Sequence, residues 1–119
     1  MVLINRGMWI VVAFLSMGQA SATEVVTVKT GVMSELEWNA LAKKSNCLYC
    51  HALDHKILGP SFREVAAEYV GKPDAEAYLL KKVSEGGVGK WGGTSMPSQS
   101  PPATQDEIKA LLRYILRLK

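Results

Sequence analysis

The sequence contains few of the residues that build metal cages and disulfide frameworks, with two cysteines and two histidines in 119 residues. A structural zinc site needs four ligands, and beyond Cys47, Cys50 and His51 the only other histidine is His55, with no second CxxC pair. A disulfide between the two cysteines would close a very small loop and add little stability. A thioredoxin-like redox pair would lie near a strand–helix–strand pattern, which the sequence lacks. The cysteine content therefore disfavours all three of these roles.

Net charge and long apolar runs are also scarce. The formal net charge is +3, whereas nucleic-acid binders usually carry a strongly basic face, so no nucleic-acid partner is expected. An apolar run over residues 8–17 is well short of the roughly 20 residues that a membrane-spanning helix needs. With Arg6 before it and Ala20-Ser21-Ala22 after it, this run predicts a secretory signal peptide over residues 1–22, with an uncleaved anchor as the alternative. Cleavage leaves residues 23–119, which is enough for one domain. We expect no stable membrane insertion after cleavage.

Five residues, Cys47-Leu48-Tyr49-Cys50-His51, have the spacing of a covalent haem attachment site. Two thiols three residues apart can each add to one vinyl group of a porphyrin, and the adjacent imidazole can then bind the iron. We therefore predict one haem c, held through Cys47 and Cys50, with His51 as an axial ligand. Export to the periplasm fits this prediction, because bacteria attach haem to apocytochromes outside the inner membrane.

Pairs of a hydroxyl and a carboxylate at the spacing of a capping box predict three helix starts. The pairs are Ser34 with Glu37, Ser61 with Glu64, and Thr104 with Glu107. A fourth helix is predicted over residues 75–85. Apolar stripes at helical spacing follow these starts, including Leu36, Trp38, Leu41 and Ala42 in the first helix and Tyr78 and Leu79 in the helix over 75–85. The predicted fold class is all-α, with four or five short helices over residues 34–119 after an extended arm over 23–33.

Residues 86–103 are rich in Gly, Pro and Ser and show no period, which predicts a long functional loop without regular structure. Iron needs a second ligand opposite His51, and three methionines are lost with the predicted signal peptide. Met33 precedes the first helix, on the part of the chain that leads into the haem motif. His55 is only four residues from His51, which is too close to cross to the opposite face of the porphyrin. Met96, in the loop, is therefore the predicted second ligand, with a lysine or a water molecule as the alternative that would give a weaker or pH-dependent site. A thioether favours ferrous iron and so raises the reduction potential.

With these motifs, the sequence resembles a small bacterial class I c-type cytochrome, of the kind that donates electrons to periplasmic nitrite reductases and terminal oxidases. The resemblance covers about residues 35–119. It rests on residues 47–51 and on the further matching positions Leu58-Gly59-Pro60-Ser61-Phe62, Val65-Ala66, Tyr69, Val83, Gly86-Gly87, Gly89, Trp91-Gly92, Met96-Pro97 and Tyr114-Ile115-Leu116.

The resemblance implies the class I cytochrome c fold around one covalent haem and a role for each site residue. His51 and Met96 would be the axial ligands, and the Pro60 carbonyl would accept a hydrogen bond from the His51 ring. Trp91 would donate its indole N–H to a haem propionate, with plain core packing as the alternative. Lys82 would reach the same propionate or remain a solvated helix charge.

The function implied is that of a monomeric periplasmic electron carrier, not an enzyme, which passes single electrons between redox partner proteins. The alternative is a haem subunit permanently bound to a periplasmic dehydrogenase or oxidase, which the arm over 23–33 would wrap. A third hypothesis, a small peroxidase or gas-binding protein, requires Met96 not to bind iron. Lys90 departs from the family, because an apolar residue is common before Trp91. With Lys43, Lys44 and Lys56 it is a candidate for the surface around the haem edge.

Overall fold

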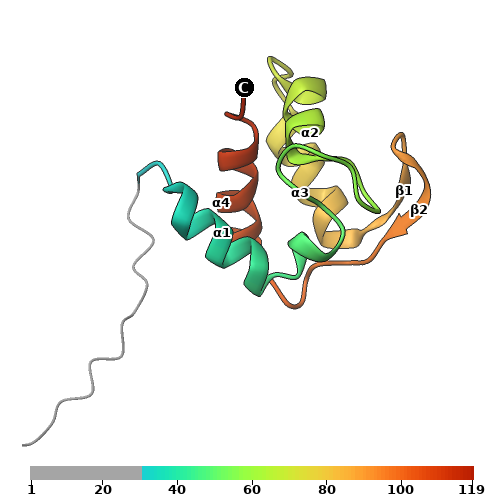
Figure 1. Ribbon diagram of the computed structural model, residues 1–119, viewed down its shortest axis with the longest axis horizontal. Coiled ribbons are helices and arrows are strands. Elements are labelled where there is room, and N and C mark those ends of the chain that lie inside the picture. The colour runs from blue at the N-terminus through green and yellow to red at the C-terminus, as the bar shows by residue number, and fades with distance from the viewer. Residues whose placement is uncertain (1–30) are drawn as a thin grey trace, which may run out of the picture.

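The computed structural model describes residues 31–119, so the predicted signal peptide and most of the predicted arm lie outside the described residues. The elements in chain order are α1 (Glu35–Lys44), the short 3-10 helix η1 (Cys47–Tyr49), α2 (Phe62–Tyr69), α3 (Ala75–Glu85), β1 (Gly87–Gly89), β2 (Gly92–Met96) and α4 (Gln105–Ile115). The predicted all-α class with four or five short helices is confirmed as a mostly helical fold, with four α-helices and one short 3-10 helix in the described residues (Figure 1). No helix within residues 31–119 is long and apolar enough to cross a membrane.

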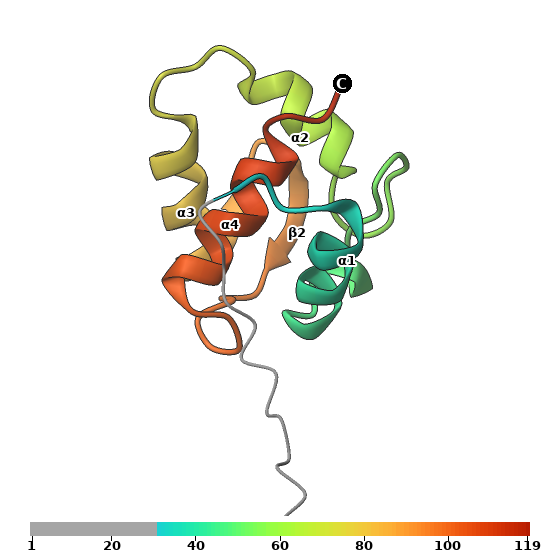
Figure 2. The ribbon, with the colours of Figure 1, turned by 90° about the vertical axis from the view of Figure 1, so that its left-hand side faces the viewer.

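Helix α4 is the centre of the packing, because it contacts each of the other three α-helices. Figure 2 shows it lying between α1 and α3. Its buried face carries the apolar stripe expected from the sequence, with Ile108, Leu111, Leu112 and Ile115 all buried. The seam between α1 and α4 is aromatic, since the ring of Trp38 stacks on Tyr114 at 5.1 Å between centroids. Trp38 also meets the edge of Phe62 at 5.0 Å, which joins this seam to α2.

All three predicted helix starts are capping boxes in the structure. At each start the hydroxyl accepts a hydrogen bond from the third helical amide, and the carboxylate of that third residue accepts one from the cap amide. At α2, for example, Glu64 N lies 3.2 Å from Ser61 Oγ and Ser61 N lies 2.7 Å from Glu64 Oε2. Two otherwise unpaired amides are satisfied at each start, which fixes where α2 begins beside the cysteine motif.

The capping box of α4 is also tied to α1, and this makes it sensitive to pH. Lys44 Nζ lies 2.5 Å from Glu107 Oε1, and Thr104 N donates to Glu107 Oε2 at 2.9 Å. These contacts, the lysine first, lower the pKa of Glu107 below its ordinary value of 4.5. Because the folded-state pKa is lowered, the stability from these contacts is present above about pH 4.5 and is lost as the pH falls through the lowered pKa.

We therefore expect Glu107→Gln to lower the free energy of unfolding by about 1 kcal/mol at pH 7, with a smaller effect at pH 3. Denaturant unfolding at both pH values measures it. Glu35→Gln is the matched control, because it removes a carboxylate from the first turn of α1 that lies outside the capping box, and should change stability by less than about 0.5 kcal/mol. Equal losses in the two variants at pH 7 would contradict this account.

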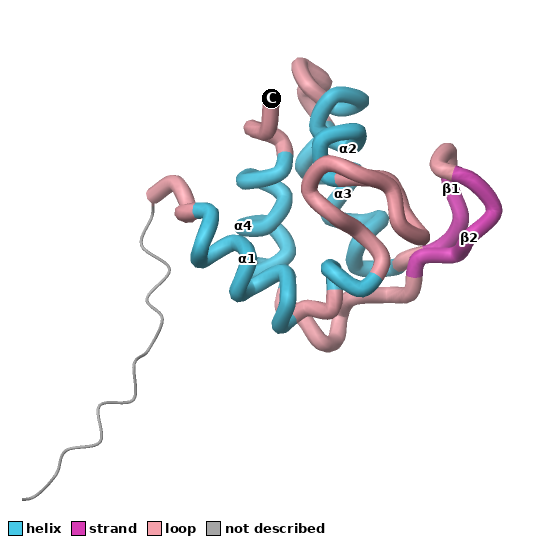
Figure 3. The backbone as a smooth tube through the Cα atoms, in the orientation of Figure 1, coloured by secondary structure: helices cyan, strands magenta, loops and turns pink. Residues whose placement is uncertain are grey.

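The prediction that residues 86–103 lack regular structure is wrong in part. Strands β1 and β2 form an antiparallel hairpin in which Gly87 pairs with Met96 and Gly89 with Gly92. Figure 3 shows this hairpin at the edge of the helical part of the fold. Its strands are short and rich in glycine, so neither strand propensity nor an alternating pattern announces them. Backbone pairing, which the sequence pattern does not display, decides the conformation here.

Two residues expected on buried helix faces are exposed instead. Leu36 in the first turn of α1 is 81% exposed and Tyr78 in α3 is 47% exposed. At 3.6 residues per turn, Leu36 lies about 200° around α1 from buried Trp38, so it is on the opposite face of the helix. Tyr78 is different, because its ring stacks on buried Tyr69 at 5.6 Å between centroids and also lines the pocket described next.

Candidate haem-binding site

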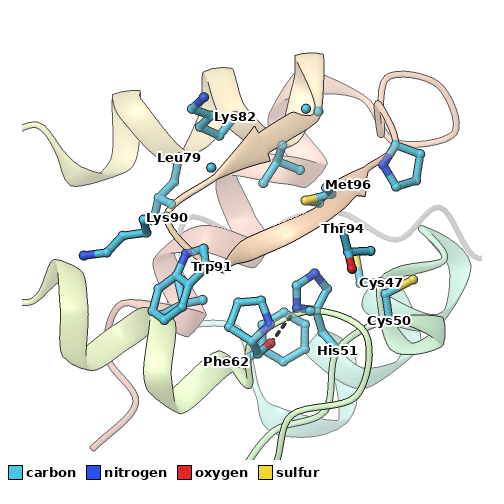
Figure 4. A pocket seen from close by; sticks show the side chains of 18 of the residues that line it. Cys47, Cys50, His51, Phe62, Leu79, Lys82, Lys90, Trp91, Thr94 and Met96 are labelled. Carbon is cyan, nitrogen blue, oxygen red and sulfur yellow. Dashed lines mark hydrogen bonds between the residues drawn. The ribbon is translucent and has the colours of Figure 1, made fainter.

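One pocket collects all seven site residues named from the sequence. It lies between α2, α3, α4 and the β1–β2 hairpin, and its lining is mainly apolar. Its walls include Cys47, Cys50, His51, Pro60, Lys82, Trp91 and Met96. In Figure 4 the two cysteines lie on one side of the pocket and Trp91 and Lys82 on the other, with His51 and Met96 pointing toward each other between them. An apolar cleft with a few polar groups at its edges suits a flat, largely apolar cofactor with two charged substituents.

The His51 ring is held in one orientation and one tautomer. Its Nδ1 lies 2.6 Å from the Pro60 carbonyl oxygen, and because a carbonyl only accepts, Nδ1 carries the proton. The Nε2 lone pair of the neutral ring is then free to bind a metal. Phe62 stacks on the other side of the ring at 5.2 Å between centroids. The capping box at Ser61 fixes the start of α2, and with it the two neighbours of Ser61 that contact the ring, Pro60 and Phe62.

Gly59 completes this cradle by leaving room for the imidazole. A Cβ at residue 59 would lie 2.4 Å from His51 Cε1 and 2.9 Å from Nδ1. The ring could escape that overlap only by breaking its hydrogen bond to Pro60 or its stacking on Phe62. The position of the His51 ring therefore requires glycine at residue 59.

We expect Gly59→Ala to displace the His51 ring and to lower the free energy of unfolding by about 1–3 kcal/mol, the usual cost of overpacking. The haem spectrum should change with it, because the histidine can no longer keep its orientation. Gly93→Ala is the control, since a Cβ there would meet no heavy atom within 4 Å. Absorption spectra and denaturant unfolding of both holoproteins measure the difference, and an unchanged spectrum in Gly59→Ala would contradict the cradle.

The two cysteines are presented by the tight turn of η1. Asn46 precedes it with a φ of 61°, a left-handed conformation that asparagine tolerates well. The amides of Cys50 and His51 both donate to the Cys47 carbonyl, at 3.3 and 3.1 Å. Both thiols are free and half-buried, and burial raises the pKa of Cys47 so that it remains protonated near neutral pH. Within residues 31–119 no group of three or more His, Cys, Asp or Glu side chains is placed to hold a metal ion.

Met96 ends β2, and the chain that follows is tied to the end of α3. Gln99 N donates to the Val83 carbonyl at 3.0 Å, and Ser98 Oγ donates to the Ser84 carbonyl at 2.5 Å. Gly86 allows this close approach, because a Cβ there would lie 2.4 Å from the Met96 carbonyl oxygen and 2.7 Å from Ser98 N. The position of Met96 therefore depends on the backbone at the end of α3.

Sequence reasoning missed two contributors at this end of the pocket. In the sequence Gly86 is only one of the positions that match the family, whereas in the structure its bare α-carbon packs against the Met96 backbone. Gln99 is buried, and its Nε2 donates to the Pro97 carbonyl at 3.1 Å. A single buried polar residue in a segment without periodicity gives no signal in one sequence.

The residues of this pocket fit a covalently attached haem. The cysteines lie at one edge of it, an imidazole with a free Nε2 lies on one side and a thioether on the other. The Trp91 indole lies away from the cysteines, where a polar substituent of a porphyrin could be met. Lys82 also lines this side but is exposed, with its ammonium 6.0 Å from the centroid of the Tyr78 ring.

Comparison with known proteins gives the family. The family model described as Cytochrome c matches residues 39–119. Cytochrome c-551 of Allochromatium vinosum is 40% identical over 97 residues, covering 82% of this chain and 99% of that protein. Cytochrome c-552 of Nitrosomonas europaea is 43% identical over 79 residues, covering 66% of this chain and 76% of that protein. The crystal structure of wild-type cytochrome c552 from the same organism superposes with a TM-score of 0.65 and 41% identity, over 68% of this chain and 99% of that chain.

The Cys47 and Cys50 spacing within this family is that of one covalent haem c. The resemblance found in the sequence is thus confirmed, and with it the expectation of an electron carrier in place of an enzyme. This chain belongs to the cytochrome c family, as a small monohaem class I cytochrome c related to the bacterial cytochromes c-551 and c-552.

Proposed function

We propose that this electron carrier works in the periplasm with His51 and Met96 as its axial ligands. The observation that carries the proposal is the tautomer of His51, whose Nδ1–H is committed to Pro60 and whose Nε2 is left for the iron. Met96 comes from the opposite side of the same pocket (Figure 4). When bound, the haem supplies a one-electron centre that alternates between ferrous and ferric iron.

The roles of this chain's own residues follow from that ligand set. Cys47 and Cys50 hold the cofactor covalently, and Pro60 keeps the imidazole in place and raises its basicity. Met96 would be the second ligand of the iron and would so exclude water, oxygen and peroxide from the metal. Trp91 and Lys82 would donate to a haem propionate from the side of the pocket away from the cysteines. With both axial positions filled by protein, this arrangement suits electron transfer and does not suit substrate binding at the metal.

Carbon monoxide distinguishes this function from that of a peroxidase or gas-binding protein. We expect the ferrous holoprotein at neutral pH to bind no carbon monoxide at concentrations that saturate a five-coordinate haem. A potentiometric titration should give a single one-electron step, as one haem requires. Rapid carbon monoxide binding by the wild type would contradict Met96 ligation and favour the gas-binding alternative.

We also propose that residues 1–22 are removed on export and that the donor and acceptor are redox proteins such as a nitrite reductase or a terminal oxidase. Of the four lysines predicted to surround the haem edge, Lys43 and Lys56 are the candidates for brief docking, since Lys44 and Lys90 already pair with Glu107 and Glu68. The mass of the protein from a periplasmic extract should equal that of residues 23–119 plus one haem. Copurification with a dehydrogenase or oxidase in a stoichiometric complex through gel filtration would instead favour the permanent-subunit alternative.

A further inference from the structure

We propose that Glu68 and Lys90 are positioning residues, whose ion pair fastens the turn of the β1–β2 hairpin to α2 and thereby holds Trp91 in the wall of the haem pocket. Lys90 Nζ lies 2.5 Å from Glu68 Oε1. Glu68 stands in the last turn of α2, and Lys90 stands in the hairpin turn directly before Trp91. The inference rests on the proposed function in one respect, namely that Trp91 faces the haem.

The hairpin has few contacts with the helices outside the pocket. Most residues of β1 and β2 line the pocket, and neither strand is among the element pairs that pack closely with a helix. A two-stranded hairpin is marginally stable in water without packing against other elements. At the Met96 end the chain is held by α3, as described above. Within residues 31–119, the Glu68–Lys90 pair is the only ion pair or side-chain hydrogen bond that joins residues 87–95 to a helix.

The lysine is placed to act on the tryptophan that follows it. Lys90 Nζ lies 5.6 Å from the centroid of the Trp91 ring, within reach of a cation–π contact. Figure 4 shows the Lys90 ammonium pointing away from the pocket while Trp91 lines it. The Lys90 ammonium therefore binds Glu68 outside the pocket, while the Trp91 indole lines the pocket. This also accounts for a lysine at a position where an apolar residue is common in the family.

Glu68 is prepared for this contact by a second lysine. Lys72 Nζ lies 2.6 Å from the same Oε1 atom, from one helical turn further along the chain. A carboxylate already held by Lys72 loses little further freedom when Lys90 binds. The second bond therefore costs less side-chain conformational entropy than an isolated surface pair. Hydrogen bonds from Lys72 and then Lys90 lower the pKa of Glu68 to about 2. These two ammonium groups are the charged partners of Glu68 among the described residues.

The test is amide and indole hydrogen exchange, followed by NMR in the folded holoprotein. Lys90→Met removes the cation and keeps an apolar stem, and Glu68→Gln removes the carboxylate charge. In both variants we expect the amides of residues 87–95 and the Trp91 indole N–H to exchange about three-fold faster than in the wild type. Lys90→Arg should restore the wild-type rate, because it restores the cation.

Lys72→Met is the matched control. It removes a lysine bound to the same carboxylate oxygen, but one that does not touch the hairpin. Only the ordering of Glu68 is lost, so hairpin exchange should rise by clearly less than in Lys90→Met. The pH profile adds a second readout. Because the pKa of Glu68 is lowered, the difference between wild type and Glu68→Gln should be constant above about pH 4.5 and disappear as the pH falls to about 2.

Unchanged hairpin exchange in Lys90→Met and Glu68→Gln would overturn the proposal. Equal acceleration in Lys72→Met would also overturn it, because the effect would then be one of surface charge alone. Neither result depends on Met96. Failure of the proposed ligand set would appear separately, as carbon monoxide binding by the wild type.

Discussion

Met96→Ala should lower the reduction potential of the holoprotein by on the order of 0.1–0.3 V, within the range of about 0.8 V over which axial ligands tune haem iron. The variant loses the soft, neutral ligand that favours ferrous iron, and water or an external ligand takes the sixth position. High-spin iron should therefore appear in at least one oxidation state, and carbon monoxide should bind to the ferrous form. Haem content should persist, since Cys47 and Cys50 still hold the porphyrin. Potentiometric titration and absorption spectra measure these changes.

Met33→Ala is the control for this substitution. Met33 is half-buried against the core outside the haem pocket, and it is the other methionine beyond the predicted signal peptide. Its removal should leave the spectrum and potential unchanged while costing about 1–2 kcal/mol of stability. If Met33→Ala opened the iron and Met96→Ala did not, the ligand assignment would be wrong.

Gly86→Ala should have the second largest effect, because it acts on Met96 through the backbone. Gly86 has φ 73° and ψ −152°, a region that only glycine adopts readily. A Cβ there would also lie 2.4 Å from the Met96 carbonyl oxygen and 2.8 Å from Pro97 C, neither of which is a flexible side chain. We expect a loss of roughly 2–5 kcal/mol in the free energy of unfolding, from strain and overlap together. The near-infrared band of methionine-ligated ferric haem should weaken or vanish.

Gly71→Ala separates strain from overlap. Gly71 has a φ of 72°, close to that of Gly86, but a Cβ there would meet no heavy atom within 4 Å. We expect a loss of about 1–2 kcal/mol, which is the usual cost of a left-handed residue other than glycine, and an unchanged near-infrared band. Equal effects of the two substitutions on that band would show that Gly86 does not position Met96.

Elements that depend on residues only a few positions apart in the chain could be predicted from the sequence. The capping boxes at Ser34, Ser61 and Thr104 each depend on residues three apart, so the helix starts are visible in the chain. The haem motif is equally local. Its five residues carry both thiols and the imidazole, and the family assignment confirms the covalent haem.

Contacts between segments that are distant in the sequence could not be predicted in the same way. The β1–β2 hairpin depends on backbone pairing of glycines, and the contact of Gly86 with Met96 depends on the path of the chain after α3. The partner of Lys90 is Glu68, on a helix that precedes it by two elements, and the sequence shows only that a lysine stands in an unusual place. Leu36 is a different case, since it was counted with the apolar stripe of α1 but lies about 200° around the helix from Trp38 and is exposed.

The account depends most on Met96 as an iron ligand, and methyl NMR of the ferrous holoprotein tests this directly. With the methionine methyl groups labelled by carbon-13, the Met96 methyl should lie against the face of the porphyrin. Its proton signal should then be shifted far upfield by the ring current, while that of Met33 stays near the ordinary position for methionine. The shifted signal should be missing from Met96→Ala. A wild-type spectrum with every methionine methyl near its ordinary position would contradict Met96 ligation.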